Sequence, residues 1–216
     1  MNKKIIIFDL DGTLLNTLED LTDSVNYMLS QFDYPSKNIE QIKNYVGNGV
    51  YKLIERAVPE GKLNKNFDKC VEIFKNRYKE NMYNKTSLYQ GIEQMLKKLK
   101  QKGFIIAVAS NKFDLAVKEL CNKYFSNLID CAFGENEKAG IKKKPSPDIV
   151  LNILTKYNLL PEQALYVGDS EVDIQTAKNS GIECISVCWG FKTKEFLNQN
   201  EATNIIDTPE EIFNFI

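Results

Sequence analysis

The sequence predicts an α/β protein: a doubly wound parallel sheet with an inserted all-helical cap domain. Short apolar runs, of the kind that form strands buried on both faces, alternate with helical patterns along most of the chain. Such alternation implies a parallel sheet with right-handed crossovers. One long segment after the first strand contains helical patterns only. We therefore predict a core formed by residues 1–15 and 88–216 and a cap formed by residues 16–87.

The first predicted strand, Ile5–Phe8, leads into two acids, Asp9 and Asp11, and then into Gly12. Parallel sheets bind ligands beyond the carboxyl ends of their strands, which is where both acids would lie. Strand alternation puts the two carboxylates on the same side, close enough to share a cation. This strand end is therefore the first candidate for an active site.

Helical patterns fill the next segment. Apolar residues recur at spacings of three and four from Leu18 to Phe32, and Thr17 with Asp20 has the pattern of a capping box. Further helical patterns cover residues 39–45, 50–58 and 67–78, and no convincing strand is expected between residues 16 and 88. The alternation then resumes, with strands predicted at Phe104–Ala109, Asp130–Gly134, Ala164–Gly168, Glu183–Cys188 and Asn204–Ile206.

Composition narrows the classes of function. The 216 residues are 43% hydrophobic, enough for a full core. A formal net charge of −1 does not indicate binding to nucleic acid or to a membrane surface. No apolar stretch approaches a membrane span, and the first apolar run is too short for a signal peptide, so we expect a cytoplasmic protein. The sequence leaves the oligomeric state open.

Histidine is absent, and the five cysteines include no C-x-x-C pair. Serine-histidine triads and histidine-ligated metals are therefore impossible, and a disulfide framework or a zinc site is disfavoured. Acid-base chemistry near neutral pH must use carboxylates, lysines, tyrosines or cysteines with shifted pKa values. A metal held by carboxylates would be a hard one, with Mg²⁺ the first choice.

A second acidic pair, Asp169 and Asp173, lies where a predicted strand ends and a helix begins. If this strand lies beside the first, four carboxylates converge, and such a cluster is costly without a cation. Mg²⁺, which binds through one or two carboxylates plus a phosphate, meets that need. The alternative is that Asp169 or Ser170 caps the helix, with solvated acids behind it.

Two further segments offer groups for binding phosphate. Ser110 and Asn111 follow an apolar strand, where a hydroxyl, an amide and backbone N–H groups can hold an anion; an ordinary helix cap and turn is the equally simple alternative. Lys144 ends a basic run, and Pro145 stiffens the chain directly after it. We expect this lysine to balance the carboxylates and bind a phosphate.

These residues occur in the order of the four motifs of the haloacid dehalogenase superfamily, and the sequence resembles that family over essentially its whole length. The resemblance implies a Rossmann-like core with a helical cap of the C1 class inserted after the first motif. The matching positions are Phe8-Asp9-Leu10-Asp11-Gly12-Thr13-Leu14, Ser110, Lys144 before Pro145, and Gly168-Asp169 with Asp173.

The resemblance also implies roles. Asp9 would be the nucleophile that forms an aspartyl-phosphate, and Asp11 would protonate the leaving oxygen and later activate water. Mg²⁺ would be held by the Asp9 carboxylate, the Asp11 backbone carbonyl and Asp169, with Asp173 supporting its waters or Lys144. The implied activity is magnesium-dependent hydrolysis of a small phosphorylated metabolite.

The cap segment Tyr45–Val50 resembles that of phosphoglycolate phosphatases and related pyrophosphatases, so Gly47, Asn48 and Gly49 are candidate substrate contacts. The alternative is that the glycines merely join two cap helices. Lys52 and Arg56 could reach an anionic group of the substrate, although surface charge is the simpler interpretation.

Other functions fit parts of the pattern. A β-phosphoglucomutase-like phosphotransferase would share core and cap, but the lack of histidine counts against it. A non-catalytic phospho-signalling or binding protein is disfavoured by the intact acids and the helical insert.

Overall fold

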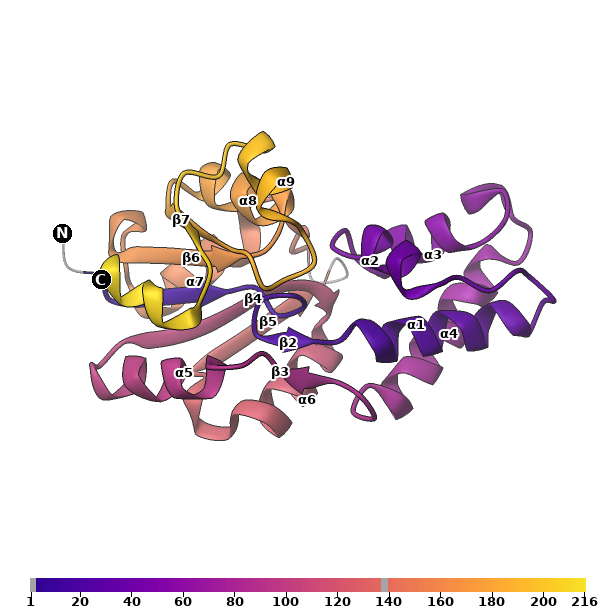
Figure 1. Ribbon diagram of the computed structural model, residues 1–216, viewed down its shortest axis with the longest axis horizontal. Coiled ribbons are helices and arrows are strands. Elements are labelled where there is room, and N and C mark those ends of the chain that lie inside the picture. The colour runs from indigo at the N-terminus through magenta and orange to yellow at the C-terminus, as the bar shows by residue number, and fades with distance from the viewer. Residues whose placement is uncertain (1–2, 137–139) are drawn as a thin grey trace. The chain divides into compact units, whose positions relative to one another are not determined.

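The computed structural model describes residues 3–136 and 140–216. The chain forms two compact units: one comprises Met1–Leu15 and Leu88–Ile216, and the other comprises Asn16–Ser87. Figure 1 traces both units in chain order. The predicted fold class, an α/β core with an inserted helical domain, is confirmed.

The first unit contains a six-stranded sheet in which every neighbouring pair is parallel. Its spatial order is β5-β4-β1-β6-β7-β8, so consecutive strands are linked by crossovers on both sides of β1. The strands are β1 (Ile5–Phe8), β4 (Ile105–Phe113), β5 (Cys131–Glu135), β6 (Ala164–Gly168), β7 (Glu183–Val187) and β8 (Ile205–Ile206).

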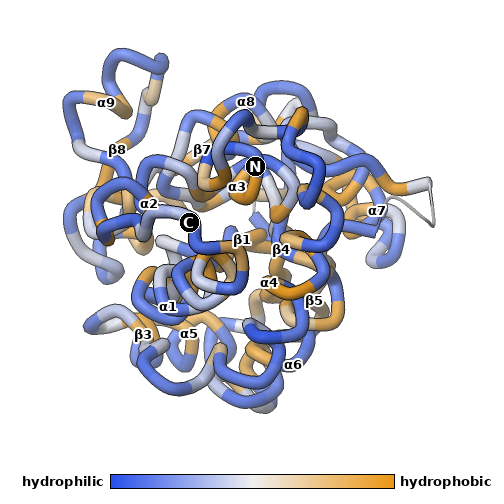
Figure 2. Tube along the Cα trace, turned by 90° about the vertical axis from the view of Figure 1, so that its right-hand side faces the viewer, coloured by the Kyte–Doolittle hydropathy of each residue, from blue (hydrophilic) through white to orange (hydrophobic). Residues whose placement is uncertain are grey.

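Helices cover both faces of this sheet, and Figure 1 shows α5 and α6 on the side opposite α8. On one face, Ile5 and Ile7 of β1 pack in a cluster with Ile149 and Ile153 of α7 and Ala177 of α8. Figure 2 shows hydrophobic colour next to the labels of β1 and β4. The helices are α5 (Ile92–Gln101), α6 (Asp114–Phe125), α7 (Asp148–Tyr157), α8 (Glu171–Ser180) and α9 (Lys194–Gln199), with short 3₁₀ turns at Ser126–Leu128, Pro161–Gln163 and Pro209–Asn214.

The fourth strand differs from the prediction, because β4 continues past Ala109 to Phe113. Ala109 pairs with Phe133, but the next pair is Phe113 with Glu135. Four steps along β4 therefore match two steps along β5, and the strand bulges between these pairs. The sequence does not predict this longer strand, because the polar residues of the bulge are typical of a turn.

The second unit consists of α1 (Leu18–Ser30), α2 (Ile39–Tyr45), α3 (Val50–Ala57) and α4 (Phe67–Asn81), with a 3₁₀ turn at Gly61–Leu63. All four helices match predicted patterns. The expectation of no strand between residues 16 and 88 is wrong only at its ends, where β2 (Leu15–Asn16) and β3 (Ser87–Leu88) form a separate two-stranded sheet.

Asp20 does not form the expected capping box with Thr17, whose side chain makes no capping hydrogen bond. The Asp20 carboxylate is buried and instead accepts hydrogen bonds from the backbone N–H groups of Lys85 and Thr86 and from the Thr86 hydroxyl. A buried carboxylate needs several donors, and residues 85 and 86 supply them.

None of the helices within the described ranges is both long enough and apolar enough to cross a bilayer.

Candidate active site

The candidate site lies at the carboxyl ends of β1, β4 and β6. Asp9 follows β1 directly, and its backbone N–H donates to the Val167 carbonyl oxygen at 2.8 Å, which extends the pairing with β6. Asp169 follows β6, and Ser110 lies in β4 just past the residues paired with β1. Parallel pairing of the three strands therefore brings these side chains to one edge of the sheet.

Three carboxylates gather at this edge: Asp9, Asp169 and Asp173. All three are buried, and each offers an oxygen within 4.8 Å of the other two. Burial raises the pKa of Asp9 to about 7, as do the charges of Asp173 and Asp11, while Lys144 lowers it. Burial, followed by the charges of Asp173 and Asp9, also raises the pKa of Asp169 well above its ordinary value.

Lys144 brings a cation into this cluster. Its ammonium donates to Asp9 Oδ1 and to Asp173 Oδ1, both at 2.7 Å, and to the Tyr166 hydroxyl at 3.0 Å. Although burial lowers the pKa of Lys144, the charges of Asp173 and Asp9 raise it well above its ordinary value. One ammonium among three carboxylates leaves two negative charges when all the acids are ionised.

Asp11 is not part of this cluster in the residues that the structure describes. Its Oδ2 lies 3.0 Å from Lys112 Nζ, with the two side chains 12% and 4% exposed respectively. The expected convergence of four carboxylates is therefore wrong: three converge. The physical reason is that the Lys112 ammonium offers Asp11 an opposite charge of its own.

Asn111 holds the backbone of Lys144 in a two-way pair. Its side-chain oxygen accepts from the Lys144 N–H at 2.7 Å, and its amide donates to the Lys144 carbonyl oxygen at 2.9 Å. The Lys144-Pro145 peptide bond is cis. Ser110 is buried beside Asn111, and its hydroxyl oxygen accepts the N–H of Lys112 at 3.2 Å.

Two glycines allow the backbone to approach Asp169. Gly12 has φ of +90°, and a Cβ there would lie 2.3 Å from Asp169 Oδ2. A Cβ on Gly190 would lie 2.4 Å from both Asp169 Cβ and the Gly12 carbonyl oxygen. The Phe191 N–H donates to Asp169 Oδ2 at 2.6 Å, so the carboxylate is held from the other side.

Asp173 lies in the first turn of α8 and also takes part in the capping of this helix. Its Oδ2 accepts from the Ser170 N–H at 3.2 Å and from the Ser170 hydroxyl at 2.6 Å, while its Oδ1 binds Lys144. The capping alternative raised from the sequence is thus part of the arrangement, but the acids behind the cap are buried rather than solvated.

The sequence model of the family described as haloacid dehalogenase-like hydrolase matches residues 6–187. The chain belongs to this family. Among curated relatives, phosphoglycolate phosphatase of Psychrobacter arcticus is 32% identical over 215 residues, 96% of this chain and 93% of that protein. That of Pasteurella multocida is 35% identical over 199 residues, 87% of each chain. The crystal structure of a provisionally named phosphoglycolate phosphatase from Lactobacillus delbrueckii subsp. bulgaricus has a TM-score of 0.94 and 36% identity, and the match covers 100% of this chain and 99% of that one.

The predicted family is therefore confirmed, and so is the predicted class of enzyme, a haloacid dehalogenase-type phosphatase. The roles of individual site residues remain predictions, which the geometry above constrains. The sequence alone assigns no role to Lys112 or Tyr166. Lys112 follows Ser110 and Asn111 directly, but nothing in a sequence indicates that its partner lies at Asp11, about a hundred residues away.

In the helical unit of this haloacid dehalogenase-like hydrolase, Gly47, Asn48 and Gly49 join α2 to α3. Gly47 and Gly49 have φ of +111° and +83°, which accounts for both glycines as turn residues. Their predicted contact with substrate stays a prediction.

Lys52 and Arg56 have partners within the helical unit. Lys52 pairs with Glu55 at 3.0 Å, and Arg56 donates to the Tyr45 carbonyl oxygen at 2.8 Å. The Arg56 contact joins α3 to the end of α2. These contacts support structural roles for both cations over recognition of a substrate anion.

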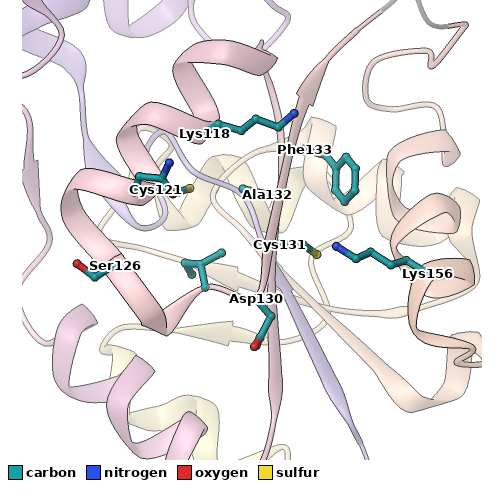
Figure 3. Close-up of a pocket in the computed structure, with 10 residues that line it drawn as sticks. Lys118, Cys121, Ser126, Asp130, Cys131, Ala132, Phe133 and Lys156 are labelled. Atoms are coloured by element: carbon teal, nitrogen blue, oxygen red, sulfur yellow. The ribbon is translucent and has the colours of Figure 1, made fainter.

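A separate cavity of about 460 Å³ opens between α6, β5 and α7, and Figure 3 shows Lys118 and Lys156 among its lining. Its wall contains none of the predicted site residues; within the described chain it comprises Lys118, Cys121, Asn122, Ser126, Ile129, Asp130, Cys131, Ala132, Phe133 and Lys156.

Proposed function

We propose that this enzyme is a magnesium-dependent phosphatase that hydrolyses a small phosphate monoester resembling phosphoglycolate, through an aspartyl-phosphate on Asp9. The observation that carries the proposal is the buried cluster of Asp9, Asp169 and Asp173 around Lys144. The relatives named as phosphoglycolate phosphatases support the substrate class.

The donor set fits a hard divalent cation. Three buried carboxylates against one ammonium carry two negative charges, which a divalent ion would balance. Asp9 and Asp169 would hold Mg²⁺, and the family resemblance adds the backbone carbonyl of Asp11. Asp173, whose oxygens accept from Lys144 and Ser170, would support the site from behind these ligands. When bound, Mg²⁺ would neutralise charge on the phosphoryl group.

The chain's own residues then perform two displacements. A carboxylate oxygen of Asp9 attacks phosphorus, the bond from phosphorus to the ester oxygen breaks, and Asp11 gives its proton to the departing alkoxide. In the second step Asp11 takes a proton from water, the water oxygen attacks phosphorus, and the Asp9–phosphorus bond breaks. Inorganic phosphate and an ionised Asp9 result.

Lys144 and Ser110 bind the phosphoryl oxygens in this scheme. The ammonium of Lys144 already lies 2.7 Å from the nucleophile Asp9, and Ser110 is buried in the adjoining strand. A fixed cation in a dry site stabilises charge far more than one in water. For Asn111 we propose a positioning role in place of the predicted phosphate contact, because its amide oxygen and nitrogen both bind the backbone of Lys144.

The test is release of inorganic phosphate from a panel of 2-phosphoglycolate, pyrophosphate, sugar phosphates and nucleoside monophosphates, with and without Mg²⁺. We expect hydrolysis of a small monoester that chelation abolishes and that Asp9→Asn reduces by at least about a thousandfold. Activity that survives chelation, or Asp9→Asn, contradicts the proposal.

The same panel tests the alternatives. Preference for pyrophosphate would identify a pyrophosphatase. Conversion of a sugar phosphate to its isomer without release of phosphate would identify a mutase.

A further inference from the structure

Lys112 occupies a position that the bulge in β4 creates. Between the pairs Ala109–Phe133 and Phe113–Glu135 the extra residues of β4 leave the regular alternation, and Ser110, Asn111 and Lys112 are all buried. The bulge is tightly packed, because a Cβ on Gly134 of β5 would lie 2.5 Å from the Lys112 carbonyl oxygen. The backbone that carries Lys112 therefore has little freedom.

The side chain of Lys112 ends against Asp11. The distance from Nζ to Oδ2 is 3.0 Å, and only 4% of the lysine side chain is exposed. Ordering a long side chain and removing an ammonium from water are both costly, so such a lysine is retained where its charge has a defined partner. The two lysines of the site thus form ion pairs with different acids: Lys144 pairs with Asp9 and Asp173, and Lys112 pairs with Asp11.

We propose that Lys112 is a positioning residue for Asp11, holding its carboxylate in the orientation needed for proton transfer. This inference rests on the proposed function, in which Asp11 protonates the leaving oxygen. The Lys112 side chain acts through Asp11 and not through the phosphoryl group. The effect of Lys112 on the rate should therefore be large where the leaving group must be protonated and small where it need not be.

The experiment compares two substrates in wild type and Lys112→Met. One is the alkyl phosphate that the enzyme hydrolyses best, whose alkoxide must be protonated as it leaves; the other is p-nitrophenyl phosphate, whose phenolate leaves without a proton. The parameter kcat/KM reports phosphoryl transfer to Asp9 for both. We expect Lys112→Met to lower kcat/KM for the alkyl ester by roughly a hundredfold and for the aryl ester by less than about tenfold.

Three controls accompany this comparison. Lys112→Arg keeps the charge and should restore much of the lost alkyl-ester activity. Lys118→Met removes an exposed lysine that pairs with Asp114 on the adjoining helix, and it should change neither substrate's kcat/KM more than about twofold. Magnesium affinity, measured from the Mg²⁺ dependence of thermal unfolding, should be unchanged in Lys112→Met.

Equal losses on the two substrates would overturn the inference, because they would place Lys112 at the phosphoryl group or in the general stability of the site. No loss on either substrate would also overturn it. If Lys112→Met does not fold, the same two substrates are compared in Lys112→Gln, which also lacks the charge. A wild type that hydrolyses neither ester would refute the proposed function itself, whereas an active wild type with equal losses refutes only the role of Lys112.

Discussion

The metal-free enzyme should lose stability as the pH rises, because Asp9 must ionise inside the carboxylate cluster. Burial and the neighbouring charges of Asp173 and Asp11 raise the pKa of Asp9 from 3.8 to about 7 in the folded protein, against the opposing effect of Lys144. The folded state therefore holds this proton more tightly than the unfolded state. The stability that protonated Asp9 contributes is fully present below the pKa of the unfolded state and is lost as the pH rises through the pKa of the folded state.

The magnitude follows from the two pKa values. One pKa unit corresponds to about 1.4 kcal/mol, and about two units separate pH 5 from the folded pKa of Asp9, so the loss between about pH 5 and pH 8 is roughly 3 kcal/mol. Asp9→Asn removes this titration and keeps an oxygen that can accept the hydrogen bond from Lys144. Between about pH 5 and pH 8, the unfolding free energy of Asp9→Asn should therefore rise by roughly 3 kcal/mol relative to that of wild type.

Urea unfolding of both proteins in a chelator, at several pH values across this interval, measures the difference. Millimolar Mg²⁺ should stabilise wild type more at about pH 8 than at pH 5, because the cation competes with the proton for the cluster. If the unfolding free energies of wild type and Asp9→Asn in chelator change in parallel with pH, the reasoning is refuted.

Three further perturbations test separate parts of the structure. Lys144→Met leaves the carboxylates without their ammonium, so urea unfolding in chelator should show a loss of about 3–5 kcal/mol, part of which Mg²⁺ restores; an unchanged midpoint would contradict this. Gly12→Ala forces a Cβ toward Asp169 at positive φ, and calorimetric titration should find Mg²⁺ affinity reduced by about tenfold or more; wild-type affinity would show that the loop yields. Asp20→Ala leaves the backbone N–H groups of Lys85 and Thr86 without their acceptor, so the free energy of unfolding should fall by about 2–3 kcal/mol and hydrogen exchange at these two amides should rise. Unaltered exchange would contradict a stabilising role for these hydrogen bonds.

The sequence indicates the sheet well, because strands such as Ile5–Phe8 are buried on both faces and read as continuous apolar runs. The acids at strand ends are equally visible, since Asp9 and Asp169 directly follow such runs and Asp173 lies in the first turn of the helix after the second run. From the sequence their convergence is conditional on the sixth strand lying beside the first, and the structure shows that β1 and β6 are paired.

What could not be inferred depends on pairings across long stretches of chain. The bulge of β4 depends on its register with β5, and Ser110–Lys112 alone looks like a turn. Lys112, which lies within that bulge, pairs with Asp11 from a distant part of the chain. Asp20 has the spacing of a helix cap, yet it is buried against residues 85 and 86, which offer it better donors.

The stereochemical course of hydrolysis tests the central claim most directly. A phosphate monoester made chiral at phosphorus with sulfur and oxygen isotopes is hydrolysed in isotopically labelled water with Mg²⁺, and the configuration of the product is determined. Each in-line displacement inverts phosphorus, so transfer to Asp9 followed by transfer to water predicts net retention. Net inversion would mean that water attacks the ester directly, and would contradict an aspartyl-phosphate on Asp9.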